Sequence, residues 1–258
     1  MKRNLRMEGY PVIFLFVITF LFQPGCSKSH APQADLLDQC QQLLLVQANG
    51  WNEFQGYLYS YERSAPGEAW KPVFSPFPVV LGLSGIAWGQ GLEDYRQEGN
   101  QKVEGDKRSP AGIFPLTSVF GYKNEQEAQV LHMPYIHVDD QIRCIEDSKS
   151  AWYNQIVSEK SVKPDWKGAD HMLRPDSLYS WGAFVGHNPD AVAQGGSCIF
   201  MHVWRGPDLG TLGCTAMAYN NMVELVYWLK SYKKPLLVQL PKSEFVQKKE
   251  AWNLPEPY

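Results

Sequence analysis

Two residues in the C-terminal half, His202 and Cys214, are of the types that together perform nucleophilic catalysis. The attacking species is a thiolate, and a free thiol with a pKa near 8.5 is only a few per cent ionised at neutral pH. A neighbouring imidazole raises that fraction by taking the proton. Because structural cysteines and core histidines are common, the assignment depends on a local structure that brings these two side chains together.

The segment that contains His202 has the alternation of a β-strand. One face would carry Cys198, Phe200, His202 and Trp204, and the other would carry Ile199, Met201 and Val203. The second face is aliphatic and suits a core, so His202 is predicted to project from the opposite side of a rigid element. Residues 205–210 have the composition of a loop, which can fold back and place Cys214 beside His202.

The residues just before Cys214 predict a tight turn. Gly213 lets the backbone bend so that the Cys214 amide could face a substrate, and with another amide of the loop it could stabilise a tetrahedral oxyanion. Loss of one such donor typically costs ~3 kcal/mol of transition-state stabilisation. The Thr211 hydroxyl could either hold this turn or contact the substrate.

Two separated motifs resemble one known family. The run from Gly196 to His202, followed by Thr211-x-Gly213-Cys214-Thr215, is similar to the signature of the YkuD-type L,D-transpeptidases, a strand histidine and then Ser/Thr-x-Gly-Cys. The upstream run from Gly105 to Pro115 resembles that family's Gly-Asp-x-x-Thr/Ser-Pro-x-Gly-x-Phe segment. The resemblance covers roughly residues 82–240 and is weakest over 123–180, where an insertion could build the substrate cleft. Leu212 and Ala216 depart from residues common in relatives, but the nucleophile and base are intact.

The resemblance implies both a fold and a mechanism. The fold would be mainly β with a few helices (α+β), with mixed sheets in a sandwich-like arrangement. Cys214 would attack the carbonyl that joins the third, L-centre residue of a peptidoglycan stem to its terminal D-amino acid. His202 would take the thiol proton and pass it to the departing amine. The thioester would then react with an amine or with water.

Three further polar residues are weaker candidates for substrate binding. His187 follows a predicted strand and is either a second base or a loop histidine at the cleft rim. Asp106 is either a substrate ligand or a turn-stabilising carboxylate. Arg205 either meets a substrate carboxylate or is a solvated loop charge. The histidines and cysteines lack the close paired spacing of common zinc motifs, so no metal or other cofactor is indicated.

The N-terminus has the pattern of an export signal. A basic stretch precedes a short apolar run, Pro11 to Phe22, which is below the ~18 residues of a membrane-spanning helix. Gly25 before Cys26 resembles a lipoprotein cleavage site, so residues 1–25 are predicted to be removed and Cys26 lipidated. A plain secretory signal is the alternative. Ser27 at the next position suggests an outer-membrane destination, if the cell has one, and otherwise a periplasmic or cell-envelope location.

The remainder is predicted to be one catalytic domain, 51–258, on a tether and amphipathic helix, 26–50. The helix is expected over Asp35–Gln47 and a second one from Asn221, with Asn221 and Glu224 as a capping box. Strands are expected at the following aromatic or aliphatic runs: 56–61, 79–83, 113–116, 135–138, 183–186, 198–204 and 236–240.

Composition and cysteine content add bounds. With 44% hydrophobic and 20% charged residues the chain reads as an ordinary globular protein, and a net charge of -3 without a basic patch argues against nucleic acid. In an oxidising compartment Cys144 and Cys198 could form a disulfide, or these residues and Cys40 could stay buried and free. The oligomeric state is not predicted.

Three functions are therefore weighed. The first is a lipid-anchored L,D-transpeptidase-type acyltransferase. The second is an L,D-carboxypeptidase or amidase-type hydrolase with the same site. The third is a non-catalytic lipoprotein that binds cell wall, which a buried or disulfide-bonded Cys214 would favour.

Overall fold

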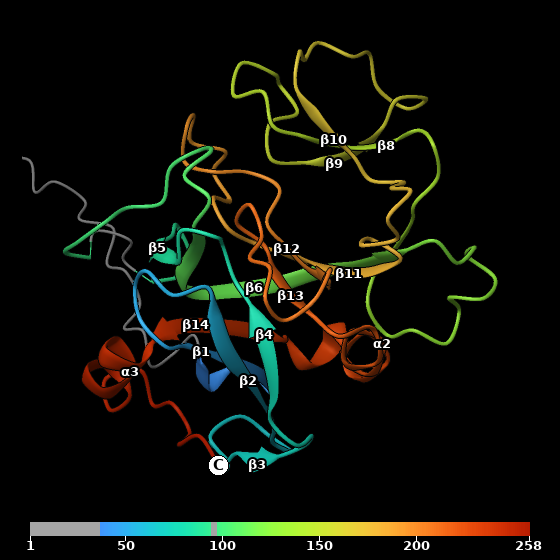
Figure 1. Ribbon diagram of the computed structural model, residues 1–258. Helices are drawn as coiled ribbons and strands as arrows, with labels where there is room; N and C mark the ends of the chain where they lie inside the picture. Colours follow the sequence, from blue (N-terminus) through green and yellow to red (C-terminus); the bar gives the residue numbers. More distant parts are fainter. Residues whose placement is uncertain (1–36, 94–96) are drawn as a thin grey trace, which may run out of the picture. The chain divides into compact units, whose positions relative to one another are not determined.

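The computed structural model describes residues 37–93 and 97–258. Within them the protein is mainly β with a few helices, so the predicted fold class is confirmed at that level (Figure 1). The predicted export signal and Cys26 lie outside the described residues. Among the residues described, no helix is long and apolar enough to cross a membrane.

The strands are β1 (Gln42–Ala48), β2 (Gln55–Glu62), β3 (Lys71–Pro72), β4 (Phe77–Val80), β5 (Ile86–Trp88), β6 (Ser109–Gly121), β7 (Tyr135–His137), β8 (Ile142–Ile145), β9 (Ile156–Ser158), β10 (Ala169–His171), β11 (Trp181–Val185), β12 (Phe200–Val203), β13 (Thr215–Met217) and β14 (Leu236–Pro241). The helices are α2 (Tyr219–Trp228), the short 3₁₀ helix η1 (Ser231–Lys233) and α3 (Lys242–Lys248).

Eight strands form a closed ring. They pair in the order β1, β14, β6, β11, β12, β13, β4 and β2, and β2 pairs back with β1. Two of these pairings are parallel, β1 with β14 and β12 with β13, and the others are antiparallel. A separate three-stranded sheet, β10-β8-β9, is formed within residues 142–171 (Figure 1).

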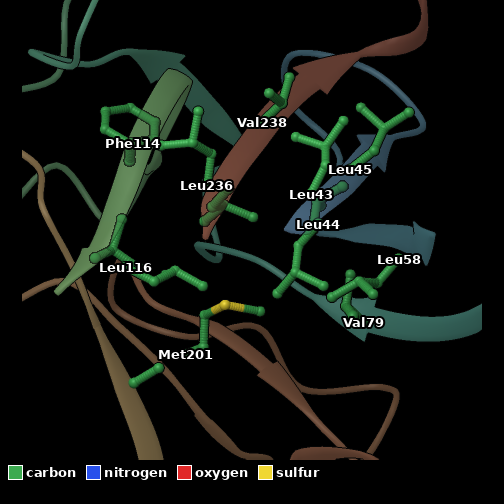
Figure 2. Close-up of a cluster of buried hydrophobic side chains, with 14 of the residues drawn as sticks. Leu43, Leu44, Leu45, Leu58, Val79, Phe114, Leu116, Met201, Leu236 and Val238 are labelled. Atoms are coloured by element: carbon green, nitrogen blue, oxygen red, sulfur yellow. The ribbon is translucent and has the colours of Figure 1, made fainter. Parts of the chain in front are cut away.

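Aliphatic side chains from most strands of the ring fill one large hydrophobic cluster. Figure 2 shows side chains of β1, β14 and β6 meeting those of β2, β4 and β12. Strand β1 contributes three successive leucines, Leu43, Leu44 and Leu45, all fully buried. The predicted helix over Asp35–Gln47 is therefore wrong from Gln42 onward. A strand with both faces buried is apolar at nearly every position, and its leucines then also match helical spacing.

The C-terminal predictions are partly confirmed. The second helix exists as α2 and buries Met222, Leu225 and Val226, and the predicted last strand is β14. The capping box is wrong, because α2 begins two residues earlier, at Tyr219, with Ala218 at its N-cap and no side-chain cap bond. Strand β14 pairs with β1 and is therefore part of the ring, and α3, which follows it, packs against β14.

A second, smaller hydrophobic cluster connects the three-stranded sheet with β12. It contains Phe120, Tyr179 and Phe200 together with the disulfide Cys144–Cys198. The Cα atoms of the two cysteines are 5.9 Å apart. One of the two arrangements that the sequence left open, the Cys144–Cys198 bridge, is thus the one formed, and Cys40 is buried and free.

Candidate active site

Strand β12 positions His202 as the alternation predicted. Ile199 and Met201 belong to the large cluster, whereas Cys198 and Phe200 belong to the smaller one. His202 lies on the side of the smaller cluster, where the Tyr179 ring packs edge-on at 5.2 Å between ring centroids. The imidazole is therefore held against an aromatic wall and is almost completely buried.

A backbone carbonyl orients the imidazole. His202 Nδ1 lies 2.7 Å from the Val203 carbonyl oxygen. Because a carbonyl can only accept, Nδ1 carries the proton in this bond and the lone pair is on Nε2. Sequence reasoning missed this partner, since any residue type could supply it. In this tautomer Nε2 can act as a proton acceptor.

The register between β12 and β13 brings Cys214 to the same face as His202. Met201 pairs with Thr215, so the preceding residue, Cys214, lies opposite Phe200, whose amide donates to Cys214 Sγ at 3.3 Å. Side chains two positions apart along a strand share a face, so Cys214, opposite Phe200, lies on the same face as His202. In the described part of the chain their hydrogen bonds go to other groups and do not join them.

Burial sets the protonation of both groups. It raises the pKa of the Cys214 thiol to about 12, although the Phe200 amide acts in the opposite direction. Burial also lowers the pKa of His202 to about 4, although the bond to the Val203 carbonyl acts in the opposite direction. At neutral pH the pair is a neutral thiol and a neutral imidazole, so the expected rise in thiolate fraction is absent from this ligand-free arrangement.

The turn before Cys214 is held by two hydroxyls. Thr211 Oγ1 donates to the Cys214 carbonyl at 2.6 Å and accepts from the Gly213 amide at 3.1 Å. Ser109 Oγ donates to the same carbonyl at 3.0 Å and accepts from the Gly82 amide at 2.8 Å. Of its two predicted roles, Thr211 thus has the turn-holding one, and the Ser109 contact was missed although Ser109 lies in the upstream motif.

Gly213 is required by its conformation. Its φ is 150°, and a Cβ there would lie 3.2 Å from the Arg108 carbonyl oxygen. Any other residue would strain the backbone and shift Cys214. Among the described residues the Cys214 amide has no hydrogen-bond partner, so it is an available donor, and its oxyanion role stays a prediction.

The three tentative substrate residues have other partners. Asp106 accepts from the Arg108 and Val103 amides and pairs with Lys102 at 2.6 Å, so it stabilises the turn. Arg205 pairs with Asp176 at 3.1 Å and is the most exposed of these groups. Asp106 thus has the turn-stabilising role of the two that the sequence left open, and substrate binding by Arg205 stays a prediction.

His187 is bonded through both ring nitrogens. Its Nδ1 accepts from the Gln90 amide at 3.2 Å, and its Nε2 donates to the Gly195 carbonyl at 2.9 Å. The side chain is buried, and that burial lowers its pKa to about 4. With both nitrogens engaged inside the protein, His187 holds the loop after β11. It is thus a buried loop histidine, and its role as a second base stays a prediction.

A charged network missed by the sequence analysis borders His202. Tyr179 donates to Asp170 at 2.6 Å, and the Arg174 guanidinium lies 5.1 Å from the Tyr179 ring. Arg174 also binds Asp176 through two hydrogen bonds, 3.0 and 2.9 Å long. Asp176 is shared with Arg205, so the rim on the His202 side is polar. No sequence motif distinguishes these residues from solvated charges.

An open cavity of about 370 Å³ lies elsewhere, beside Tyr61, Trp70 and Tyr258. It does not include Cys214 or His202. Comparisons of the chain with protein-family models, with curated proteins and with solved structures find no match. The functional interpretation therefore depends on the site itself and on the two sequence motifs.

Proposed function

We propose that this protein is an exported cysteine acyltransferase of the L,D-transpeptidase type that acts on peptidoglycan stem peptides. The main support is one arrangement: a free, half-buried Cys214 on the same strand face as a histidine with an available Nε2. The unpaired Cys214 amide adds an oxyanion donor at the nucleophile itself.

In the proposed reaction Cys214 Sγ attacks the carbonyl between the L-centre residue and the terminal D-amino acid. His202 Nε2 takes the thiol proton and donates it to the departing amine, so the C–N bond breaks as the thioester remains. An acceptor amine or water then attacks the thioester, gives its proton to His202 and regenerates the thiol. Every proton released in the first half is consumed by the leaving amine.

The neutral resting pair supports one order for the first step. Since burial raises the pKa of Cys214 and lowers that of His202, the proton stays on sulfur until substrate is bound. Proton transfer then accompanies attack, with His202 as a general base.

Two further parts of the proposal come from the sequence. The family resemblance implies the finer fold, a sandwich-like catalytic domain, whereas the strands described above close into a ring. The N-terminal pattern implies an export signal ending at Gly25 with a lipidated Cys26, which would place the enzyme in the cell envelope, at the outer membrane where one exists.

Mass spectrometry of the products tests the proposal. The full chain is incubated with a disaccharide-tetrapeptide and with a stem that supplies an acceptor amine, beside the Cys214→Ala variant. Loss of the terminal D-residue with a crosslinked dimer is expected from the wild type alone. Trimmed monomer despite abundant acceptor would identify a hydrolase. Unchanged substrate with folded protein would favour the non-catalytic, wall-binding alternative.

A further inference from the structure

Lys102, in the loop between β5 and β6, is a buried lysine close to the nucleophile turn. Its side chain is only 3% exposed. The ammonium donates to Asp106 Oδ1 at 2.6 Å and to the Val103 carbonyl oxygen at 3.1 Å. Lysine is almost never buried to this degree unless it is paired, because removing an ammonium from water is costly. The neighbours of this buried charge show what it can act on.

Two glycines define the place of the ammonium. A Cβ added to Gly213 would be 3.8 Å from Lys102 Nζ, and a Cβ added to Gly196 would be 3.2 Å from Lys102 Cε. Gly213 directly precedes the nucleophile. Gly196 begins the segment that leads to Cys198, whose carbonyl accepts from Cys214 Sγ at 3.6 Å. Lys102 therefore lies between the turn that presents the thiol and the segment that the thiol contacts.

The turn around Lys102 has its own support without the ammonium. The Asp106 carboxylate accepts from the Val103 amide at 3.0 Å and from the Arg108 amide at 2.9 Å, which fixes residues 103–108. An ammonium has three N–H donors, and within the described part of the chain two of them have partners, Asp106 and the Val103 carbonyl. One donor is therefore left beside the Gly213 turn.

The charges around Cys214 oppose one another. Several titratable side chains besides Lys102 act on the thiol or share its face: Asp170, Glu146, Tyr179 and His202. Burial is the main cause of the raised pKa of Cys214, and the carboxylates of Asp170 and Glu146 raise that pKa further, whereas Lys102 lowers it. Burial also lowers the pKa of His202 to about 4, so the imidazole is uncharged at neutral pH and brings no positive charge to the thiol.

We infer that the Lys102 ammonium stabilises the negative charge that forms at Cys214, on the thiolate sulfur during attack and then on the oxyanion beside the Cys214 amide. This inference rests on the proposed function for the reaction and adds a residue to its site. A neighbouring lysine favours a thiolate over a thiol, and a positive charge fixed next to a developing oxyanion stabilises the transition state. Asp106 holds the ammonium in place.

Two alkylating reagents that differ in charge test the inference. Iodoacetamide is neutral and iodoacetate is an anion, and the Cys214 thiolate displaces iodide from either one. Both rates are measured on the full chain at about pH 8, where the rate follows the thiolate fraction. Mass spectrometry of the Cys214 peptide separates this thiol from the other free cysteines. A positive charge at the thiol favours the anionic reagent, so the ratio of the iodoacetate rate to the iodoacetamide rate reports that charge.

Lys102→Met removes the charge and keeps a side chain of similar length. It should lower the iodoacetamide rate about tenfold, because a nearby opposite charge shifts a pKa by about one unit or more. It should lower the iodoacetate rate further, so that the rate ratio falls several-fold. Lys102→Arg, which keeps the charge, should keep the wild-type ratio. A change in packing alone would slow both reagents alike and leave the ratio unchanged.

The matched control is Lys233→Met. Lys233 is also a partly buried lysine paired with a carboxylate, that of Glu62, and it acts on the pKa of Glu62. This variant should keep both alkylation rates of the wild type. If circular dichroism shows that Lys102→Met does not fold, the double variant Lys102→Met/Asp106→Asn replaces it, since that variant leaves no unpaired carboxylate behind.

The rate ratio decides the matter. An unchanged or raised ratio in the folded variant that lacks Lys102 would overturn the inference, and so would an equal fall of the ratio in Lys102→Arg. Neither reagent requires turnover, so this result does not depend on the proposed function. The proposed function fails instead if the wild type releases no D-amino acid from the disaccharide-tetrapeptide.

Discussion

Two buried histidines, His187 and His202, share an environment but not a set of partners. Burial lowers the pKa of each to about 4. His187 has both ring nitrogens bonded to backbone groups, whereas His202 is bonded to the backbone only through Nδ1. Burial and a shifted pKa therefore do not by themselves identify a catalytic base. What distinguishes His202 is an available nitrogen on the face that also holds a free thiol.

The surroundings of His187 and His202 also differ: one residue lies in a hydrogen-bonded loop and the other in a strand. His187 lies in a loop whose backbone is fixed by Asn154, which donates to the His187 and Asn188 carbonyls and accepts from the Cys198 amide. His202 lies within a strand, and the aromatic ring of Tyr179 packs against it. His187 takes part in hydrogen bonds that hold a loop, whereas His202 is positioned by its strand and by the Tyr179 ring.

The largest expected effect separates the two residues by activity. His202→Ala should lower kcat ~10²–10⁴-fold, because a positioned base is lost. His187→Ala should keep kcat within a few-fold while lowering the free energy of unfolding, because two buried backbone groups lose their partner. D-amino acid release and urea unfolding measured on both variants check this. An equal loss of kcat in a folded His187→Ala would contradict the comparison.

The next effect concerns the disulfide between Cys144 and Cys198. Replacing Cys144 and Cys198 together by alanine should cost about 4 kcal/mol of unfolding free energy, given a sequence separation of 54 residues. The smaller cluster that His202 faces would lose its covalent link to the three-stranded sheet. Dithiothreitol should destabilise the wild type by a similar amount and leave the double variant unchanged. A destabilisation of the double variant by the reductant would assign the effect to another cause.

Acid titration tests the lowered pKa that His187 and His202 share. A lowered folded-state pKa means that stability is complete above the ordinary value of 6.5 and is lost as pH falls towards 4. Each histidine should contribute roughly 3 kcal/mol of this loss. Each alanine variant should therefore lose less stability than the wild type between pH 7 and pH 4, by similar amounts.

The contribution of each histidine is read from the difference in unfolding free energy between variant and wild type. The wild-type curve alone does not isolate it, because other groups titrate as well. Burial raises the pKa of Glu93 to about 7, and its Oε1 has no hydrogen-bond partner in the described structure. Its contribution is complete below its ordinary value and is lost as pH rises through 7, opposite in sign to that of the histidines. Identical slopes in variant and wild type would show that the histidine does not titrate on unfolding.

Sequence periodicity predicted a strand where its two faces carry different kinds of residue. The alternation around His202 gave β12 its two faces correctly, because Ile199 and Met201 pack in one cluster and Phe200 in the other. The same reasoning failed for β1, whose two faces are both buried. The closed ring was not predictable either, because it depends on the β1–β14 and β14–β6 pairings between segments far apart in the chain.

The site was predictable where side-chain identity matters and not where the backbone acts. Cys214, His202 and Gly213 follow from their types and order. The partner of His202 Nδ1 is a carbonyl, and the second support of the Cys214 turn, Ser109, is 105 residues away. The role of His187 was left open because its two partners are backbone groups of separate loops, which leave no sequence pattern.

The smallest expected effect concerns the turn that holds the thiol in the His202 region. Thr211→Val removes one of two hydroxyls on the Cys214 carbonyl and the acceptor of the Gly213 amide. Because Ser109 still donates to that carbonyl, the loss should be about 1 kcal/mol of unfolding free energy and less than tenfold in kcat. Thr211→Ser should restore both values. If Thr211→Val instead lost as much activity as His202→Ala while Thr211→Ser recovered it, the hydroxyl would act on the substrate, and the turn would depend on Ser109 alone.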